Sequence, residues 1–391
     1  MSILNATWIS EEQRILHDSA LRFTQETFEP QREAWEKQGM CDRDAWRQAG
    51  EAGLLCASIP EEYGGSGGDF THEAVIYDAM IRGGAAASLA GGNAVHSQIV
   101  AHYVLNYGSE AQKQRWLPAM ASGELVSAIA MTEPGVGSDL QSVKTSAVAD
   151  DATDEYVING SKTFISNGQH ADLIVVVCKT DPAMRARGIS LVIVEALTEG
   201  VATAGFSRGR NLEKIGLKEA DTSELFFDNV RVPKANLLGK DEGQGFFQLM
   251  SQLPQERLSI ALSAATTAEM AVEATVQYTK EREAFGKTVF DFQNTRFKLA
   301  ECKTEACVSR AFVDQCMVKH LEGNLSAEEA SMAKWWCTQK QCDIVDECLQ
   351  LHGGFGYMWE YPIARMYADS RVQKIYGGTN EIMKELISRS L

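Results

Sequence analysis

A glycine-rich turn flanked by hydroxyl side chains is the first stretch of this chain whose residue types could bind a ligand. It reads Thr132-Glu-Pro-Gly-Val-Gly-Ser138-Asp139. Glycines let backbone amides approach a ligand closely, and the hydroxyls of Thr132 and Ser138 can donate hydrogen bonds to carbonyl or phosphate oxygens. A Gly-x-Gly pair on its own is more often part of an ordinary turn, so its role depends on the rest of the chain.

A carboxylate near the start of a long apolar helix is the second candidate. Glu256 and Arg257 stand in Leu253-Pro-Gln-Glu-Arg-Leu258, after which apolar residues recur every three or four positions as far as Val276. A carboxylate in a water-excluded pocket can act as a general base, because burial raises its pKa. A Glu-Arg pair on a helix usually faces solvent, so both readings stay open from these residues alone.

Three further motifs lie in the last third of the chain. They are Glu281-Arg-Glu-Ala-Phe-Gly-Lys287, Leu351-His-Gly-Gly-Phe-Gly-Tyr357 and Ile375-Tyr-Gly-Gly-Thr379. The second is not preceded by a strand, so it is no Rossmann dinucleotide fingerprint. Together with residues 131–139, these motifs resemble the acyl-CoA dehydrogenase family of flavoenzymes, and the resemblance spans nearly the whole chain.

The resemblance implies a fold and an activity. Members have an α-helical N-terminal domain, a central antiparallel β-barrel and a C-terminal four-helix bundle, a multidomain α+β fold. They use FAD to convert a saturated acyl-CoA to the trans-2-enoyl-CoA and pass the electrons to electron-transfer flavoprotein. Members of this size are usually homotetramers, each a dimer of dimers. Two alternatives remain open, an acyl-CoA oxidase and a flavin-binding homologue that no longer dehydrogenates.

The resemblance also indicates where the base is. Most members carry a catalytic glutamate at the first glycine of the Tyr-Gly-Gly-Thr run, where this chain has Gly377. The long-chain and isovaleryl-type members place it on the first bundle helix, in a setting similar to Glu256-Arg257-Leu258. One carboxylate is enough, so we expect Glu256 to remove the substrate's α-proton. The family's donors to the enolate oxygen are the flavin ribityl 2′-hydroxyl and the backbone amide at Gly377.

Other site residues follow from the resemblance. Phe164 stands where many relatives have a tryptophan against the flavin ring, although packing on the barrel core would also suit it. Arg282 is placed to reach the FAD pyrophosphate of a neighbouring subunit, although an arginine there also offsets a helix dipole. The full set expected at the cofactor is Ile129, Met131, Thr132, Gly137, Ser138, Phe164, Ser166, Arg282, Phe285, Gln293, Gln350, Gly353, Gly354, Thr379 and Glu381.

The acyl-CoA is expected near a second, partly overlapping set. Ser138 lies where the flavin pyrophosphate and the CoA come close, and Arg257 and Gly378 flank the base and its loop. Gly91 and Gly92 leave volume at the floor of the acyl pocket, which favours a long or branched chain, although a simple helix break explains them equally well. Chain length and branching therefore stay open.

The elements that must position these residues change character twice. Residues 1–125 have helical patterns with capping boxes at Ser10 and Ser109, and residues 126–238 are short β-branched runs separated by turns. One of these runs contains Asn159-Gly160, which predicts a hairpin turn. Residues 239–391 return to helices, with long ones expected over about 294–321 and 327–352.

Composition narrows the class of protein. The chain has 391 residues and a formal net charge of −16, which argues against nucleic-acid partners, because phosphates would be repelled. No apolar run is long enough to span a membrane. The His and Cys spacing matches no metal site. The start lacks the features of a secretory or mitochondrial leader, so we expect a cytoplasmic protein, although a leader already removed would leave the same start.

Overall fold

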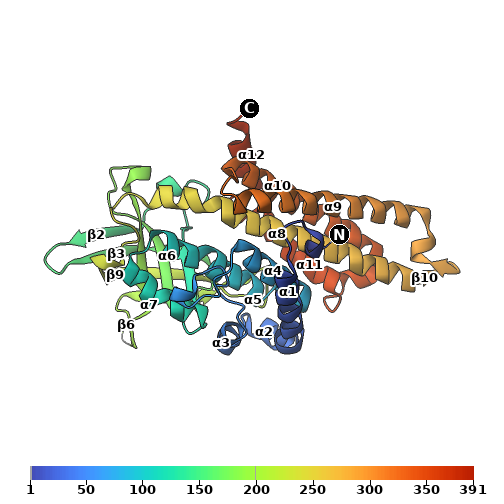
Figure 1. Ribbon diagram of the computed structural model, residues 1–391, viewed down its shortest axis with the longest axis horizontal. Coiled ribbons are helices and arrows are strands. Elements are labelled where there is room, and N and C mark those ends of the chain that lie inside the picture. The colour runs from blue at the N-terminus through green and yellow to red at the C-terminus, as the bar shows by residue number, and fades with distance from the viewer. Residues whose placement is uncertain (1, 199) are drawn as a thin grey trace.

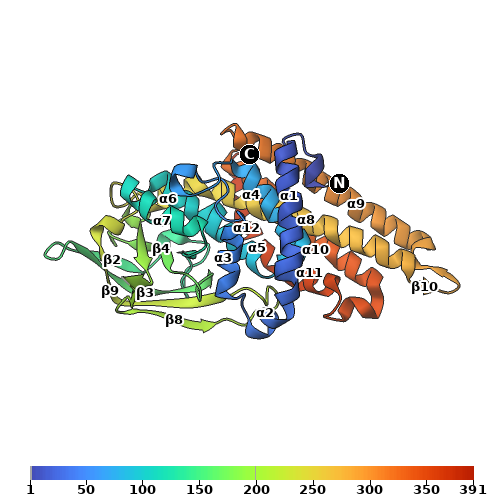
Figure 2. The ribbon, with the colours of Figure 1, turned by 60° about the horizontal axis from the view of Figure 1, so that its bottom comes forward.

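The computed structural model describes residues 2–198 and 200–391 and has helices at both ends of the chain around a central sheet. Figure 1 shows the sheet at one end of an elongated molecule and the long C-terminal helices reaching to the other. The fold predicted from the sequence is confirmed in its three parts. The helical N-terminal part lies against both of the others (Figure 2).

The N-terminal part is a layer of short helices. Ser10 and Ser109 cap two of them, with each Oγ accepting from the backbone amide three residues on, at 3.4 and 3.2 Å, as the sequence predicts. A π-helical turn, Ala94–Val100, continues into the sixth helix. The helices are α1 (Glu11–Phe23), α2 (Arg32–Gln38), α3 (Arg43–Glu51), α4 (Phe70–Met80), α5 (Leu89–Asn93), α6 (Ala101–Tyr107) and α7 (Glu110–Ala121).

The central part is a curled, open sheet of seven strands within the described residues, rather than the closed antiparallel barrel expected. Its order is β1-β4-β2-β3-β9-β8, with β5 on the other side of β4, and β1 runs parallel to β4. The strands are β1 (Ser127–Ala130), β2 (Ser146–Asp150), β3 (Glu155–Ser166), β4 (Leu173–Lys179), β5 (Ile189–Glu195), β8 (Phe206–Asn211) and β9 (Thr222–Pro233), with a separate small pair β6 (Leu197–Thr198) and β7 (Val201–Ala202).

The sheet is a half-barrel, and around β4 it is covered on both faces. Every residue of β4 is buried. Leu173, Val175 and Val177 pack against the N-terminal helices, whereas Ile174 and Val176 face the other core, formed within the sheet itself. Helices therefore supply the closure that further strands would give in a barrel.

The predicted Asn-Gly hairpin is wrong. Asn159 and Gly160 lie within one continuous strand, β3, which pairs with β9 on both sides of them. The ladder shifts register at this point, and Gly160 has a φ of +153°. A Cβ at Gly160 would lie 2.4 Å from Oγ1 of Thr145, so the glycine accommodates a close approach within a β-bulge and does not turn the chain.

The C-terminal part is built on three long helices. They pack against one another, and the shorter α11 and α12 pack against α10. The observed bounds match the expected 294–321 and 327–352 within a residue. The elements are α8 (Gly245–Glu281), β10 (Glu283–Ala284), β11 (Lys287–Thr288), α9 (Gln293–Leu321), α10 (Ala327–His352), α11 (Pro362–Ser370) and α12 (Asn380–Ser388).

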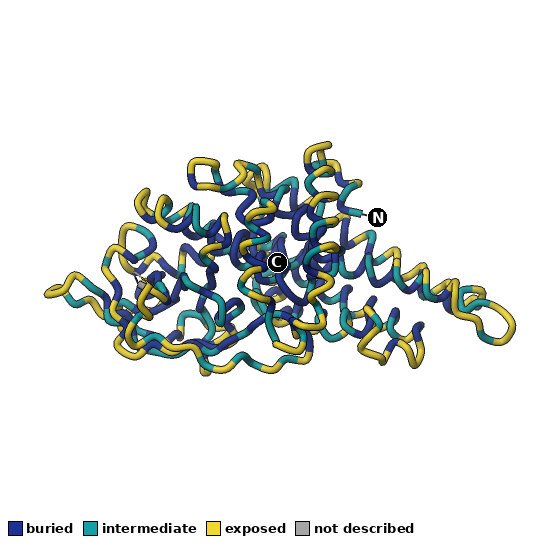
Figure 3. Tube along the Cα trace, turned by 90° about the horizontal axis from the view of Figure 1, so that it is seen from below, coloured by how far each residue is buried: buried dark blue, intermediate teal, exposed yellow. Residues whose placement is uncertain are grey.

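A buried ion network joins the N-terminal helices to the bundle. Arg310 of α9 has no exposed side-chain surface and donates to Glu269 of α8 at 2.9 Å and to Asp78 of α4 at 3.3 Å. Arg82 donates to the same two carboxylates, and His17 of α1 contacts Asp78 at 3.1 Å. The network fixes four helices relative to one another, and the side chains of Arg310, Asp78 and Glu269 belong to the interior of the molecule, whose buried chain is dark blue in Figure 3.

Within residues 2–198 and 200–391, no helix is both long and apolar enough to cross a membrane.

Candidate active site

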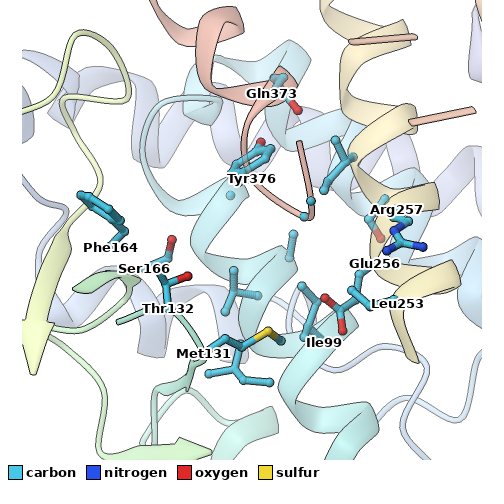
Figure 4. A pocket seen from close by; sticks show the side chains of 18 of the residues that line it. Ile99, Met131, Thr132, Phe164, Ser166, Leu253, Glu256, Arg257, Gln373 and Tyr376 are labelled. Atoms are coloured by element: carbon cyan, nitrogen blue, oxygen red, sulfur yellow. The ribbon is translucent and has the colours of Figure 1, made fainter. Parts of the chain in front are cut away.

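A cavity of about 630 Å³ lies where the sheet, α8 and the loop before α12 meet. Figure 4 shows Phe164, Ser166 and Thr132 on one side of this space and Glu256 on the other. The structure therefore brings together residues that are distant in sequence. Among the predicted site residues, those that line it are Gly91, Gly92, Ile129, Met131, Thr132, Gly137, Ser138, Phe164, Ser166, Glu256, Arg257, Gly377 and Gly378.

The glycine-rich turn is held by a buried lysine. Lys162 of β3 donates to Glu133 at 2.9 Å and to the carbonyl of Met131 at 3.0 Å. Glu133 also accepts from the backbone amides of Lys144 and Thr145, at 2.7 and 2.9 Å. Because these groups are buried and paired, they hold the backbone of the turn in place, and its residues Thr132, Gly137 and Ser138 line the cavity.

Phe164 is a large apolar residue that the described part of the chain leaves mostly uncovered. The residue is 68% exposed. Its backbone φ is +60°, a conformation that L residues seldom adopt. A register shift in β3 between Lys162 and Ile165 turns the ring outward toward the cavity. Backbone strain combined with an exposed aromatic ring is typical of a site where a flat ligand covers the ring.

Glu256 is buried opposite this ring. The residue is 5% exposed, and the Tyr103 hydroxyl of α6 donates to its Oε1 at 2.9 Å. Burial raises the pKa of Glu256 to about 7, against the opposing effects of the Tyr103 hydrogen bond and the Arg257 charge. A carboxyl with that pKa can accept a proton near neutral pH and release it again.

The loop of Gly377 and Gly378 borders the same space without offering a side chain. Both glycines have positive φ, +65° and +91°. A Cβ at Gly377 would lie 2.3 Å from Cδ1 of Ile260, so a glutamate there would need both a strained backbone and a displaced Ile260. Of the two positions where a catalytic base could stand, Gly377 in the loop and Glu256 on α8, only Glu256 carries a carboxylate.

A buried lysine holds this loop, and a buried arginine lies beside it. Lys334 of α10 donates to the carbonyl of Gly378 at 2.8 Å and to Asn380 at 3.0 Å. Burial, and then the charge of Arg257, lower the pKa of Lys334 to about 7. Arg257 donates to Ser331 at 3.3 Å, and its Nη2 lies 4.0 Å from where a Cβ of Gly378 would stand. Arg257 thus contacts the loop side of the cavity rather than pairing with a surface carboxylate.

The two glycines expected at the pocket floor differ in their surroundings. A Cβ at Gly91 would meet nothing within 4 Å, so a side chain there would enter open space. A Cβ at Gly92 would lie 2.7 Å from Oδ1 of Asn167 and 3.2 Å from the Trp46 ring. Gly91 therefore borders free volume, whereas Gly92 allows close packing of α5.

Comparison with known proteins agrees with this geometry. The acyl-CoA dehydrogenase N-terminal, middle and C-terminal domain models match residues 10–124, 128–230 and 243–391. The pig (Sus scrofa) mitochondrial long-chain specific acyl-CoA dehydrogenase is 48% identical over 384 residues, which are 98% of this chain and 87% of that protein.

The chain belongs to the acyl-CoA dehydrogenase family.

Solved structures of this family superpose along nearly the whole chain. The acyl-CoA dehydrogenase of Geobacillus kaustophilus has a TM-score of 0.94 and 48% identity and covers 99% of both chains. A glutaryl-CoA dehydrogenase of Mycobacterium smegmatis, solved in complex with FADH2, has a TM-score of 0.89 and 27% identity, covering 98% of this chain and 95% of that one. The family prediction made from the motifs is thus confirmed.

Six of the site residues predicted from the acyl-CoA dehydrogenase motifs lie away from the cavity. Arg282 and Phe285 are at the β10–β11 arm, where the Arg282 guanidinium stacks 5.6 Å from the Phe355 ring and Phe285 is 96% exposed. This end of the bundle is the one farthest from the sheet in Figure 1. The six are Arg282, Phe285, Gln293, Gln350, Gly353 and Gly354.

Thr379 and Glu381 adjoin the cavity without lining it. Thr379 caps α12, with its Oγ1 accepting from the amide of Ile382 at 3.3 Å. Glu381, in the first turn of that helix, is exposed.

Three residues that support this acyl-CoA dehydrogenase site were missed by sequence reasoning. They are Tyr103, Lys162 and Lys334, and each acts through a partner at least 29 positions away in sequence. The sequence did offer a signal for the two lysines. Each lies in an apolar strand or helix, where a lysine is rarely buried unless it has a partner. No local signal marked Tyr103.

Proposed function

We propose that this protein is an FAD-dependent acyl-CoA dehydrogenase in which Glu256 is the catalytic base. The observation that supports this most is a buried carboxylate with a pKa of about 7 on the cavity wall, next to a loop that carries glycine instead of glutamate. The two features account for each other, because a pocket that removes one α-proton needs one base.

FAD, when bound, supplies the acceptor for a hydride from the substrate's β-carbon. The cavity suits a flat cofactor, because Phe164 presents an exposed ring beside Met131, Thr132 and Ser166. We propose that these residues hold the flavin ring, and that Ile129, Gly137 and Ser138 also bind the cofactor, with Ser138 near the flavin pyrophosphate and the CoA. Thr379, the N-cap of α12, and Glu381, in its first turn, would support the cofactor from the loop side.

The residues of the chain would act on the α-carbon. Glu256 accepts the α-proton, so the Cα–H bond breaks and an O–H bond forms on the carboxylate. The Gly377 amide donates to the thioester oxygen, where negative charge develops as the proton leaves. Lys334 keeps the Gly377–Gly378 loop against the cavity through the Gly378 carbonyl, and Arg257 lies beside the loop. Apolar walls exclude water, which strengthens both interactions.

The proposal extends to the assembly. Arg282, Phe285, Gln293, Gln350, Gly353 and Gly354 gather at the arm end of the bundle. An exposed phenylalanine and an arginine there suit a contact with the cofactor of a neighbouring subunit. We propose a homotetramer, a dimer of dimers, with domain limits near residues 125 and 238, and electron-transfer flavoprotein as the acceptor. The expected cytoplasmic location remains a prediction.

Anaerobic mixing of the purified holoenzyme with acyl-CoA thioesters tests the proposal. We expect the flavin absorbance to bleach and enoyl-CoA to form in equal amount. Reoxidation by electron-transfer flavoprotein should then be much faster than by oxygen. Bleaching followed by fast reoxidation by oxygen would identify an oxidase, and bound flavin with no bleaching by any thioester would identify a homologue without dehydrogenase activity.

The open space next to Gly91 predicts a long or branched acyl chain. Replacing Gly91 with leucine fills that space. We expect kcat/KM for long-chain acyl-CoA to fall about tenfold or more, whereas short-chain substrates are much less affected, because only a long chain reaches the new side chain. A chain-length series of steady-state rates measures this. If all lengths lose activity equally, Gly91 does not border the acyl tail.

A further inference from the structure

Tyr103 stands behind Glu256, on the side away from the cavity. It lies in α6, is fully buried, and shares a core with Val100, Trp116 and Leu249. Its hydroxyl donates to Glu256 Oε1 at 2.9 Å, across 153 positions of sequence. Tyr103 does not line the cavity, among the residues that the structure describes, so a bound substrate would touch Glu256 and not Tyr103.

The two oxygens of Glu256 have different surroundings. Oε1 accepts the Tyr103 hydrogen bond. In residues 2–198 and 200–391, no group donates to Oε2, and Oε2 is not one of the fully buried polar atoms that lack a partner. Because Glu256 lines the cavity, Oε2 is the oxygen that opens onto it. The hydrogen bond thus divides the carboxylate into a held oxygen and a free one.

We propose that Tyr103 is a positioning residue for the base: its hydroxyl fixes Oε1 of Glu256 and thereby presents Oε2 to the α-proton of a bound thioester. This inference rests on the proposed function. In the step, the Cα–H bond breaks and its proton joins Oε2. The electron pair left on Cα forms the Cα=Cβ double bond as the β-hydrogen leaves with its own pair to the oxidised flavin.

The surroundings of Glu256 make this hydrogen bond important for its charge. Burial raises its pKa, the Tyr103 hydroxyl lowers it, and the adjacent Arg257 charge lowers it further. Two further titratable groups lie near this pair: Tyr107 of α6, whose ring centroid is 6.1 Å from that of Tyr103, and Lys334 of α10, which is close to Arg257. Burial, together with the Glu256 charge, raises the pKa of Tyr103 well above its usual value, so Tyr103 remains a donor over the working pH range.

Tyr103→Phe tests the inference, because it removes only the hydroxyl. A hydrogen bond to a charged group strongly favours the charged form, so losing it should raise the pKa of Glu256. We therefore expect the midpoint of the rise in flavin-reduction rate with pH to move up by about one to two pH units. At pH 6 the rate should fall about tenfold or more, whereas at pH 9, where Glu256 is ionised in both proteins, a smaller loss should remain because Oε2 is no longer held in place. The apparent dissociation constant for the acyl-CoA, obtained from the same rates over a range of substrate concentrations, should be nearly unchanged.

Tyr107→Phe is the matched control. Tyr107 lies one turn along α6 and donates instead to the carbonyl of Gln248 at 3.3 Å, so its profile should match the wild type. A second readout needs no turnover. Infrared titration of the holoenzyme, taken as the difference from Glu256→Gln, should show the protonated carboxyl band persisting to higher pH in Tyr103→Phe. Should that variant fail to fold, Tyr103→Met carries the same comparison.

The outcomes separate this inference from the proposed function. If Tyr103→Phe keeps the wild-type pH profile and infrared midpoint, or loses rate equally at every pH, the positioning role is wrong. The base assignment still holds in that case, provided that Glu256→Gln abolishes flavin reduction. If Glu256→Gln reduces flavin at the normal rate, the base itself is wrong, and the role of Tyr103 is wrong with it.

Discussion

Glu256→Gln is expected to retain bound flavin and to lose acyl-CoA-driven flavin reduction by about 100- to 10,000-fold, the usual contribution of a positioned general base. Glutamine keeps the size of the side chain and an oxygen that can accept from Tyr103, but it cannot take a proton. Anaerobic stopped-flow absorbance measures the rate. Flavin content and thermal unfolding serve as controls, because a misfolded variant would lose both.

The same substitution should make the protein more stable in mild alkali. Burial raises the folded-state pKa of Glu256 from 4.5 to about 7, so the folded state binds this proton more tightly than the unfolded chain does. The stability from this group is therefore fully present below about pH 4.5 and is lost as pH rises through 7. Glutamine does not titrate, so Glu256→Gln should gain about 2 to 4 kcal/mol at pH 8 and little at pH 4.

This pH dependence also applies to the reaction. The base must be ionised to accept a proton, so the wild-type rate of flavin reduction should rise with pH through about 7. A rate that is constant from pH 5 to 9 would contradict a buried carboxylate base. Higher stability of Glu256→Gln together with lost activity would mean that the site holds a destabilising charge because the chemistry needs it.

Arg310→Leu is expected to lower the free energy of unfolding by about 3 to 5 kcal/mol, because it removes a fully buried positive charge that two buried carboxylates share. Burial alone would raise the pKa of Asp78, but the His17 hydrogen bond and the charges of Arg310 and Arg82 hold it well below its usual range. Asp78 is therefore charged in the folded state at neutral pH. Removing Arg310 leaves Asp78 and Glu269 to share Arg82, while Asp78 keeps its hydrogen bonds with His17 and Thr266.

Chemical denaturation of Arg310→Leu measures this loss. The matched control is Arg231→Leu, since Arg231 pairs with Asp150 and Glu155 on the surface, with its side chain 48% exposed. Solvent-exposed pairs contribute about 0 to 1 kcal/mol, so the control should unfold almost as the wild type does. Equal losses in the two variants would mean that the central network does not join the N-terminal helices to the bundle.

The order of helical and strand regions along the chain could be predicted from local sequence patterns. The bundle helices α9 and α10 begin and end within a residue of their sequence limits, because capping and apolar spacing are local signals. Strand pairing is not local. Asn159-Gly160 has the composition of a turn, and only the partner strand β9 and the nearby Thr145 show that it is a bulge.

The candidate site divides in the same way. The motifs located Thr132, Phe164 and the Gly377 loop, since the residue types carry the pattern, and the absence of a loop carboxylate drew attention to Glu256. The groups that set the chemistry could not be found from spacing. Tyr103 meets Glu256 across 153 positions, and Lys334 meets Gly378 across 44, so only folding reveals either contact.

Exchange of the α-hydrogen with solvent tests the location of the base most directly. An acyl-CoA whose β-carbon carries no hydrogen, such as 3,3-dimethylbutyryl-CoA, can lose its α-proton but has no hydride to transfer. In heavy water, the wild-type holoenzyme should place deuterium at the α-carbon, as read by NMR or mass spectrometry, and Glu256→Gln should not. Exchange by Glu256→Gln at the wild-type rate would contradict a base on α8.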